Sequence, residues 1–89
     1  MAPSLYDVVL SPKADKQLDD LPISLQRRIT QALEELEPNP RPPGAIKLQG
    51  TDDLWRIRVG DYRIVYTIKD RELLVLVVRL GHRRDIYKN

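Results

Sequence analysis

The sequence predicts an α+β fold in two layers, with the element order β-α-α-β-β-β and two N-terminal helices on one face of a largely antiparallel sheet. Apolar residues recur at helical spacing between positions 11 and 37 and alternate with polar ones between positions 54 and 66. The apolar run Leu73–Val78 is typical of a strand that is central or buried on both faces. Because 89 residues suffice for one modest core, we expect a single domain over 1–89.

The N-terminal half supplies a short strand and the helical layer. Leu5–Leu10 alternates as a strand, after which Ser11 is a favourable N-cap and Pro12 suits the first helical position. The first helix ends before Pro22, because the residue before a proline is disfavoured in the α region, and a second helix is predicted over Pro22–Glu37. Each helix carries an apolar stripe that can cover one sheet face: Ala14, Leu18 and Leu21, then Leu25, Ile29, Ala32, Leu33 and Leu36.

The C-terminal half supplies the rest of the sheet. Segment 38–44 is rich in proline and predicts a rigid return from helix to sheet, which we favour over a proline-rich docking motif. A turn follows at Gly50–Asp53, and no strand is predicted before it. Leu54–Val59, the turn Gly60-Asp61 and a return strand form a hairpin, and the last strand is expected over Glu72–Leu80.

The two-residue turn fixes the register of this hairpin. The predicted cross-strand pairs are Val59 with Tyr62, Arg58 with Arg63, Arg56 with Val65, and Trp55 with Tyr66. The face toward the core then carries Trp55, Ile57, Val59, Tyr62, Ile64 and Tyr66, and the opposite face carries Arg56, Arg58 and Arg63.

Three arginines on one sheet face indicate a site for an anion. Like charges directly opposite each other destabilise a sheet, so stability alone gives no reason to place Arg58 opposite Arg63. The planar guanidinium suits phosphate, whereas a solvated surface is the simpler interpretation for any single arginine. An apolar floor of Val65, Leu76 and Val78 inside the arginine rim predicts a shallow cleft, which would also suit a partner peptide.

The C-terminal tail adds further candidates for chemistry. His82, Arg83, Arg84 and Tyr87 fall within six residues. The phenol of Tyr87 could stack on a base or act as a proton acceptor if neighbouring guanidiniums stabilise its phenolate. The alternatives are a solvated His82 and a Tyr87 packed back on the core. Arginines can stabilise a phosphoryl-transfer transition state without a metal, and we expect no metal and no cofactor, because no carboxylates have metal-ligand spacing.

Composition narrows the class of partner. Residues 1–45 carry five Lys/Arg against seven Asp/Glu, a net charge of −2, and residues 46–89 carry ten against six, a net charge of +4. A basic sheet half suggests a polyanion such as nucleic acid. The absence of cysteine and the single histidine argue against disulfides and zinc. The N-terminus lacks a secretory signal and no apolar run could span a membrane, so we expect a cytoplasmic protein without a membrane partner.

Three motifs, KLQG (47–50), LWRIRVGDYRIVY (54–66) and RLGHRRDIY (79–87), together with the order of elements, resemble the RelE/ParE superfamily of toxins from type II toxin–antitoxin systems. The resemblance implies a microbial-ribonuclease-like fold and a cognate antitoxin with which the chain forms a hetero-oligomer. RelE-like members, the branch favoured here, enter the ribosome and cut mRNA by attack of the ribose 2′-OH on the adjacent phosphate, without metal. ParE-like members instead inhibit DNA gyrase, and an inactive relative that only binds antitoxin is a further alternative.

The resemblance also implies roles for individual residues. Arg63 would stabilise the transition-state phosphate, and Arg83 would act as general acid or stabilise the leaving group. Arg56 and Arg58 fall where well-known members carry lysines, so an electrostatic role carries over to them. The C-terminal tyrosine falls on Tyr87 as the base or a base-stacking residue, although its spacing from the Gly-His pair is shorter than in some members. Three further assignments complete the site: His82 as a substitute acid or base, and Lys47 and Arg84, with Arg56, as RNA contacts.

Overall fold

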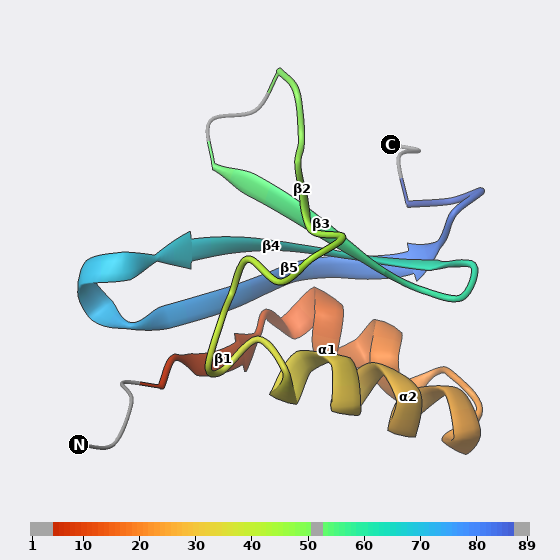
Figure 1. Cartoon of the computed structure of the whole chain (residues 1–89). Helices are drawn as coiled ribbons and strands as arrows, with labels where there is room; N and C mark the ends of the chain where they lie inside the picture. The colour runs from red at the N-terminus through yellow and green to blue at the C-terminus, as the bar shows by residue number, and fades with distance from the viewer. Residues whose placement is uncertain (1–4, 51–52, 87–89) are drawn as a thin grey trace.

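The computed structural model describes residues 5–50 and 53–86, which form two helices packed on one face of a five-stranded sheet (Figure 1). This arrangement confirms the predicted α+β class and the two layers. The elements are β1 (Asp7–Leu10), α1 (Pro12–Asp19), α2 (Ile23–Glu34), β2 (Ile46–Lys47), β3 (Leu54–Val59), β4 (Tyr62–Lys69), a 3₁₀ turn (Asp70–Glu72) and β5 (Leu74–His82).

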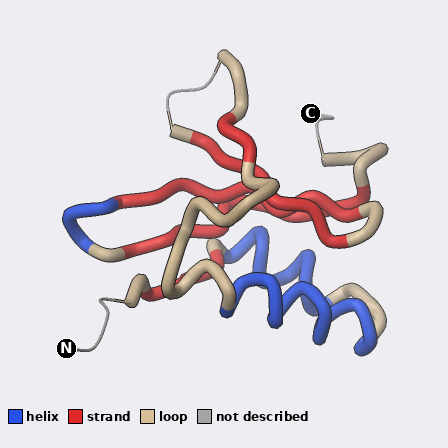
Figure 2. The backbone as a smooth tube through the Cα atoms, viewed as in Figure 1, coloured by secondary structure: helices blue, strands red, loops and turns tan. Residues whose placement is uncertain are grey.

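The sheet has the strand order β1-β5-β4-β3-β2, which puts the last strand beside the first (Figure 2). The β1–β5 pair is parallel and the other three pairs are antiparallel, so the sheet is largely antiparallel as predicted. The β3–β4 hairpin has the predicted register, including Arg58 opposite Arg63 and Trp55 opposite Tyr66. Gly60 has a φ of +58° at the first turn position, a conformation that a residue with a Cβ adopts only with strain.

The first helix begins as the sequence predicts, whereas the second begins one residue after the predicted Pro22 and ends earlier than predicted. Ser11 is the N-cap of α1, and its Oγ accepts a hydrogen bond of 3.1 Å from the N–H of Ala14. The predicted end of α2 at Glu37 is wrong, because the chain tightens after Glu34 into i→i+3 bonds, among them Leu36 N–H to Leu33 O at 3.0 Å. Leu36 nevertheless remains buried, so the predicted apolar stripe holds.

Two strand boundaries and one strand differ from the prediction. The first strand begins at Asp7 rather than Leu5. The last runs over Leu74–His82 rather than Glu72–Leu80, because the 3₁₀ turn and a left-handed Leu73 (φ 52°) delay its start. The short strand β2 was not predicted, and it pairs with β3 through Ile46 opposite Arg56 and Lys47 opposite Trp55. Two residues are too few to produce a readable alternation.

The core lies between the helices and the sheet. Ile29 and Leu33 of α2 pack there against side chains from β3, β4 and β5, and Leu18, Leu25 and Trp55 pack around them as partly buried residues. The buried members are Ala14, Ile29, Leu33, Leu36, Ile57, Val59, Ile64, Tyr66, Val75, Val77 and Leu80. These contacts confirm the predicted core face of the hairpin and leave its arginine-bearing face open.

A polar network ties the proline-rich loop to the far end of the sheet. Both guanidinium Nη atoms of Arg41 donate to the carboxylate of Asp70, at 3.1 and 2.9 Å, and the hydroxyl of Tyr6 donates to the same carboxylate at 2.7 Å. The hydrogen bonds from Arg41 and then Tyr6 lower the pKa of Asp70 to about 2. Arg41 also lies 5.3 Å from the centroid of Trp55, and Tyr66, whose pKa burial raises to about 12, donates to the carbonyl of Pro40 at 2.7 Å.

Candidate active site

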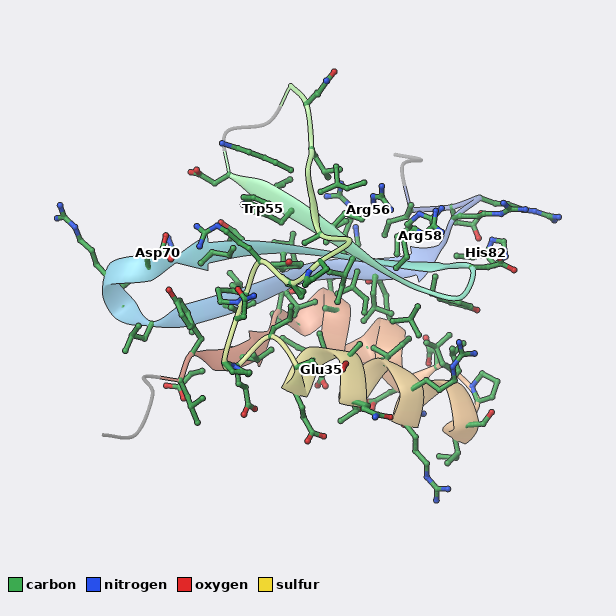
Figure 3. The ribbon with its side chains drawn as sticks, viewed as in Figure 1. Glu35, Trp55, Arg56, Arg58, Asp70 and His82 are labelled. Atoms are coloured by element: carbon green, nitrogen blue, oxygen red, sulfur yellow. The ribbon has the colours of Figure 1, made fainter. Side chains whose placement is uncertain are left out.

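The arginine face is the side of the sheet turned away from α1 and α2, where Arg56, Arg58 and Arg63 project. Arg58 lies directly opposite Arg63 on the neighbouring strand, and Arg56 lies opposite Val65. Arg58 is exposed, whereas Arg56 and Arg63 are partly buried. The labelled side chains of Arg56 and Arg58 point away from the helices (Figure 3). The structure thus brings together the three arginines that the alternation predicted.

The electrostatics of this face are unbalanced. Within residues 5–50 and 53–86, no carboxylate forms an ion pair with Arg56, Arg58 or Arg63. The Nη1 atom of Arg56 is buried and has no hydrogen-bond partner among the described residues. A buried donor without an acceptor costs free energy, and so do like charges directly opposite each other on a sheet. An anion bound on this face would relieve both costs.

The tail after β5 carries Arg83 to the hairpin turn. The N–H of Arg83 donates to the carbonyl of Asp61 at 2.7 Å, and its Nε lies 3.8 Å from Oδ1 of the same residue. Both side chains are exposed, so the ion pair contributes little and the backbone bond is the firmer anchor. The tail then makes one turn, in which Ile86 donates to the carbonyl of His82 at 3.0 Å and buries its own side chain. Arg83 is therefore anchored at the turn that joins the strands of Arg58 and Arg63.

His82 lies on the other face of the sheet. It is paired with Tyr62, whose ring it meets edge-on at 5.6 Å between centroids and 82° between planes. Its Nδ1 accepts a hydrogen bond of 3.1 Å from the N–H of Arg84. Together with residues of α2 such as Leu25 and Arg28, it lines a cavity of about 340 Å³. The structure therefore does not place the imidazole among the arginines, but uses it to hold the start of the tail.

The remaining predicted residues are spread more widely. Lys47 is paired with Trp55, so it leaves its strand on the side of the core face rather than the arginine face, and it is exposed. Arg84 is exposed in the turn of the tail. Tyr87 lies outside the described residues, so its predicted role stays a prediction.

One further arginine joins the arginine face and was not assigned from the sequence. Arg79 lies opposite Val65, which is fully buried between it and Arg56. A β-bulge between Val77 and Arg79 causes this placement, so Val78 has no partner on β4 and is not a regular part of the predicted floor. A signal was present in the sequence, because strict alternation from Val75 and Val77 would have put the charge of Arg79 in the core.

The described residues contain neither a candidate metal site nor a helix that could span a membrane. No group of three or more His, Asp or Glu side chains there could hold a metal ion. No helix in that part of the chain is long and apolar enough to cross a membrane.

The sequence matches a known protein family and several of its relatives. The model of the family described as "ParE toxin of type II toxin-antitoxin system, parDE" matches residues 8–87. A putative RelE-like toxin protein of Escherichia coli is 33% identical over 86 residues, covering 92% of this chain and 90% of the relative. The putative toxin RelE1 of Methanocaldococcus jannaschii is 28% identical over 87 residues, covering 94% of this chain and 97% of the relative.

Solved structures agree with these relatives. The archaeal RelE–RelB complex of Pyrococcus horikoshii has a TM-score of 0.79 at 33% identity, covering 90% of this chain and 97% of the matched chain. The toxin–antitoxin complex RelBE2 of Mycobacterium tuberculosis has a TM-score of 0.80 at 26% identity, covering 96% and 97%. The resemblance seen in the motifs is confirmed over nearly the whole chain. The chain therefore belongs to the family of ParE toxins of type II toxin–antitoxin systems, within the RelE/ParE superfamily.

Proposed function

We propose that this toxin is a ribosome-dependent, metal-independent endoribonuclease that cuts mRNA and so inhibits translation. The observation that carries the proposal is the pair Arg58–Arg63, directly opposite on an open sheet face, with Arg83 anchored at the turn between their strands. This arrangement does not stabilise the fold, whereas it can stabilise a phosphate that gains negative charge during a reaction. The RelE-like relatives support the ribonuclease reading.

The proposed reaction is an internal transesterification. The ribose 2′-oxygen bonds to the adjacent phosphorus, and the bond from phosphorus to the 5′-oxygen of the next nucleotide breaks. A base takes the proton from the 2′-hydroxyl, and the departing 5′-oxygen gains a proton. Arg58 and Arg63 stabilise the charge that develops on the non-bridging oxygens, and Arg83 stabilises or protonates the leaving oxygen. Tyr87 is the proposed base, and Tyr87→Phe separates a base, whose loss slows cutting, from a stacking residue, whose ring is retained.

Binding and chemistry fall to different residues in this proposal. Arg56, Lys47 and Arg84 contact the phosphates of the RNA and ribosome, which position the substrate without reading its sequence. No cofactor is required, and the described residues contain no cluster of carboxylates or imidazoles for a metal ion. The substrate places the activity in the cytoplasm, where translated messages are found.

The proposed protein partner is a cognate antitoxin in a hetero-oligomer. Structural relatives from P. horikoshii, M. tuberculosis and E. coli were solved as toxin–antitoxin complexes. We propose an antitoxin segment with acidic and apolar side chains that covers the arginine face or docks along the helices. Co-expression with the neighbouring small open reading frame tests this, because failure of its product to co-purify with the toxin or to rescue growth would contradict the partnership.

A second candidate function is inhibition of DNA gyrase. Its support is that the matching family model is that of the ParE toxins. Under this reading the arginine face would bind a protein or DNA surface without chemistry. The arginine set favours the ribonuclease, because the pair Arg58–Arg63, with Arg83 anchored at the turn between their strands, suits a phosphate that gains charge during reaction.

Primer extension on cellular mRNA after brief induction decides between the two. The ribonuclease reading predicts discrete cuts in translated messages, which disappear in Arg63→Ala/Arg83→Ala. Arg71→Ala, an exposed arginine in the 3₁₀ turn, is the matched control and should still cut. Loss of plasmid supercoiling with intact mRNA would instead establish the gyrase reading.

A further inference from the structure

Arg79 reaches the arginine face only because β5 is bulged. Val77 is paired with Tyr66, but the next pair along is Arg79 with Val65, so Val78 is extra. Side chains alternate along a strand, and one extra residue reverses that alternation for everything after it. Leu80 is therefore 1% exposed in the core, and Arg79 projects on the open side.

The backbone around the bulge is also bonded to the N-cap and to a side chain of α1. The Oγ of Ser11 donates to the carbonyl of Val78 at 2.8 Å, and the side-chain oxygen of Gln17 accepts from the N–H of Leu80 at 2.8 Å. These bonds satisfy two backbone groups of β5 that lie beyond the end of β1, where β5 has no neighbouring strand on that side. The direction of Arg79 is therefore set by the fold and is not a feature of a loose edge.

Arg79 and Arg56 flank the same residue. Both are paired with Val65, one from each neighbouring strand, and Val65 is 0% exposed between them. Arg56, Val65 and Arg79 thus form a row across β3, β4 and β5, in which the buried Nη1 of Arg56 has no hydrogen-bond partner among the described residues. No described carboxylate forms an ion pair with Arg79, although Asp85 and Lys13 border a hollow of about 140 Å³ beside it. The row thus holds two guanidiniums, neither of which forms an ion pair with a described carboxylate.

This row runs beside the one proposed to act on the scissile phosphate. Arg63 is two residues from Val65 on β4, which is about 6.6 Å along the strand. Its partner on β5 is Gly81, which has no side chain to separate Arg63 from Arg79. The spacing of the rows is of the order of the step between successive phosphates in an extended single strand.

We propose that Arg79 is a phosphate-binding residue and that, with Arg56, it forms a second subsite that takes the phosphate next to the one held by Arg58 and Arg63. The ligand is thus the backbone of a single-stranded nucleic acid, bound over two consecutive phosphates on two rows of arginines. The inference rests on the proposed function, since it names how that same substrate is held.

The test measures binding of a short single-stranded 2′-deoxyoligonucleotide, which cannot be cut, to the purified toxin across a range of salt concentrations. Arg79→Gln should reduce the slope of log K against log salt by about 0.7 to 1, the amount for one lost phosphate contact. Arg79→Lys should keep the slope, because it keeps the charge. Arg71→Gln, which removes an exposed arginine at the far end of β4, should also keep it.

Neutral methylphosphonate linkages, introduced one position at a time, then locate the contacts. Neutralisation of two neighbouring phosphates should weaken binding to the unmodified toxin. Arg63→Gln should be insensitive at one of them and Arg79→Gln at the other. Sensitivity at a single phosphate, or an unchanged salt slope in Arg79→Gln with a reduced one in Arg63→Gln, overturns the second subsite alone. Unchanged binding and cutting in Arg63→Gln would overturn the proposed function as well.

Discussion

At the scale of single residues, the active-site proposal depends on arginines that oppose one another. Arg58 and Arg63 are directly paired across two strands, and no described carboxylate forms an ion pair with either. Such a pair lowers the folding stability of the protein without ligand and raises its affinity for an anion. Stability and activity should therefore respond to mutation in opposite directions.

The first prediction concerns this trade-off. Arg58→Thr should raise the free energy of unfolding by roughly 0.2–1 kcal/mol at low salt, because it removes a like-charge pair and adds a residue that favours strands. The same change should slow mRNA cutting on the order of 10²–10³-fold, as for a deleted oxyanion donor. Urea unfolding and primer extension measure the two effects. Arg71→Thr is the control, and a destabilised Arg58→Thr would contradict the argument.

The second prediction concerns Asp70. Arg41 and Tyr6 lower its pKa to about 2 in the folded protein, so the network stabilises the fold fully above the ordinary carboxyl pKa of about 4. That contribution is lost as pH falls from about 4 to about 2. Asp70→Asn should therefore lower the melting temperature at pH 7, and the difference from the unmodified protein should vanish near pH 2. Glu72→Gln in the same turn is the control, and an equal loss there would refute the pairing.

At the scale of elements, features set by local sequence patterns were predictable, whereas features set by contacts between residues far apart in the chain were not. The hairpin register was predictable because alternation and the Gly60-Asp61 turn both lie within a short stretch. The bulge at Val78 was not, because Ser11 and Gln17, more than 60 residues away, hold its backbone. The missed bulge also explains His82, since the reversed alternation carries its imidazole to the Tyr62 side. The two-residue β2, which turns Lys47 away from the arginine face, was too short to read.

The third prediction concerns the first turn of α1. Ser11→Ala removes the cap on the Ala14 N–H and the donor to Val78 O, and should cost about 1–2 kcal/mol of stability. The loss should also loosen the bulge, so binding of a single-stranded oligonucleotide should weaken with it. Chemical denaturation and anisotropy measure the two effects. Ser24→Ala, an exposed helical serine outside any cap, should change neither by a comparable amount.

At the scale of the whole molecule, one face is packed and the other is charged. The helices cover one side of the sheet, and the side with four arginines carries no described helix (Figures 1 and 3). A polyanion that binds this face binds only the folded chain, so binding and stability are linked. The antitoxin, if it covers the same face, should act in the same way.

The fourth prediction follows from that linkage. A short single-stranded oligonucleotide at 100 times its dissociation constant should stabilise the toxin by about 2.7 kcal/mol. The stabilisation should fall as salt rises, because phosphate contacts release counterions. Thermal unfolding with and without oligonucleotide measures it, with Arg58→Thr/Arg63→Gln as the comparison. An equal rise in melting temperature for the double variant would show that the nucleic acid binds elsewhere.

The position of β5 has a consequence for how the protein is made. This strand follows the other four in the sequence, yet it lies between β1 and β4 and carries both Arg79 and the approach to Arg83. During synthesis the helices and the hairpin emerge first, but the sheet stays divided until the last strand is free to insert. The two arginine rows therefore cannot form on the nascent chain until β5 has left the ribosome and inserted between β1 and β4.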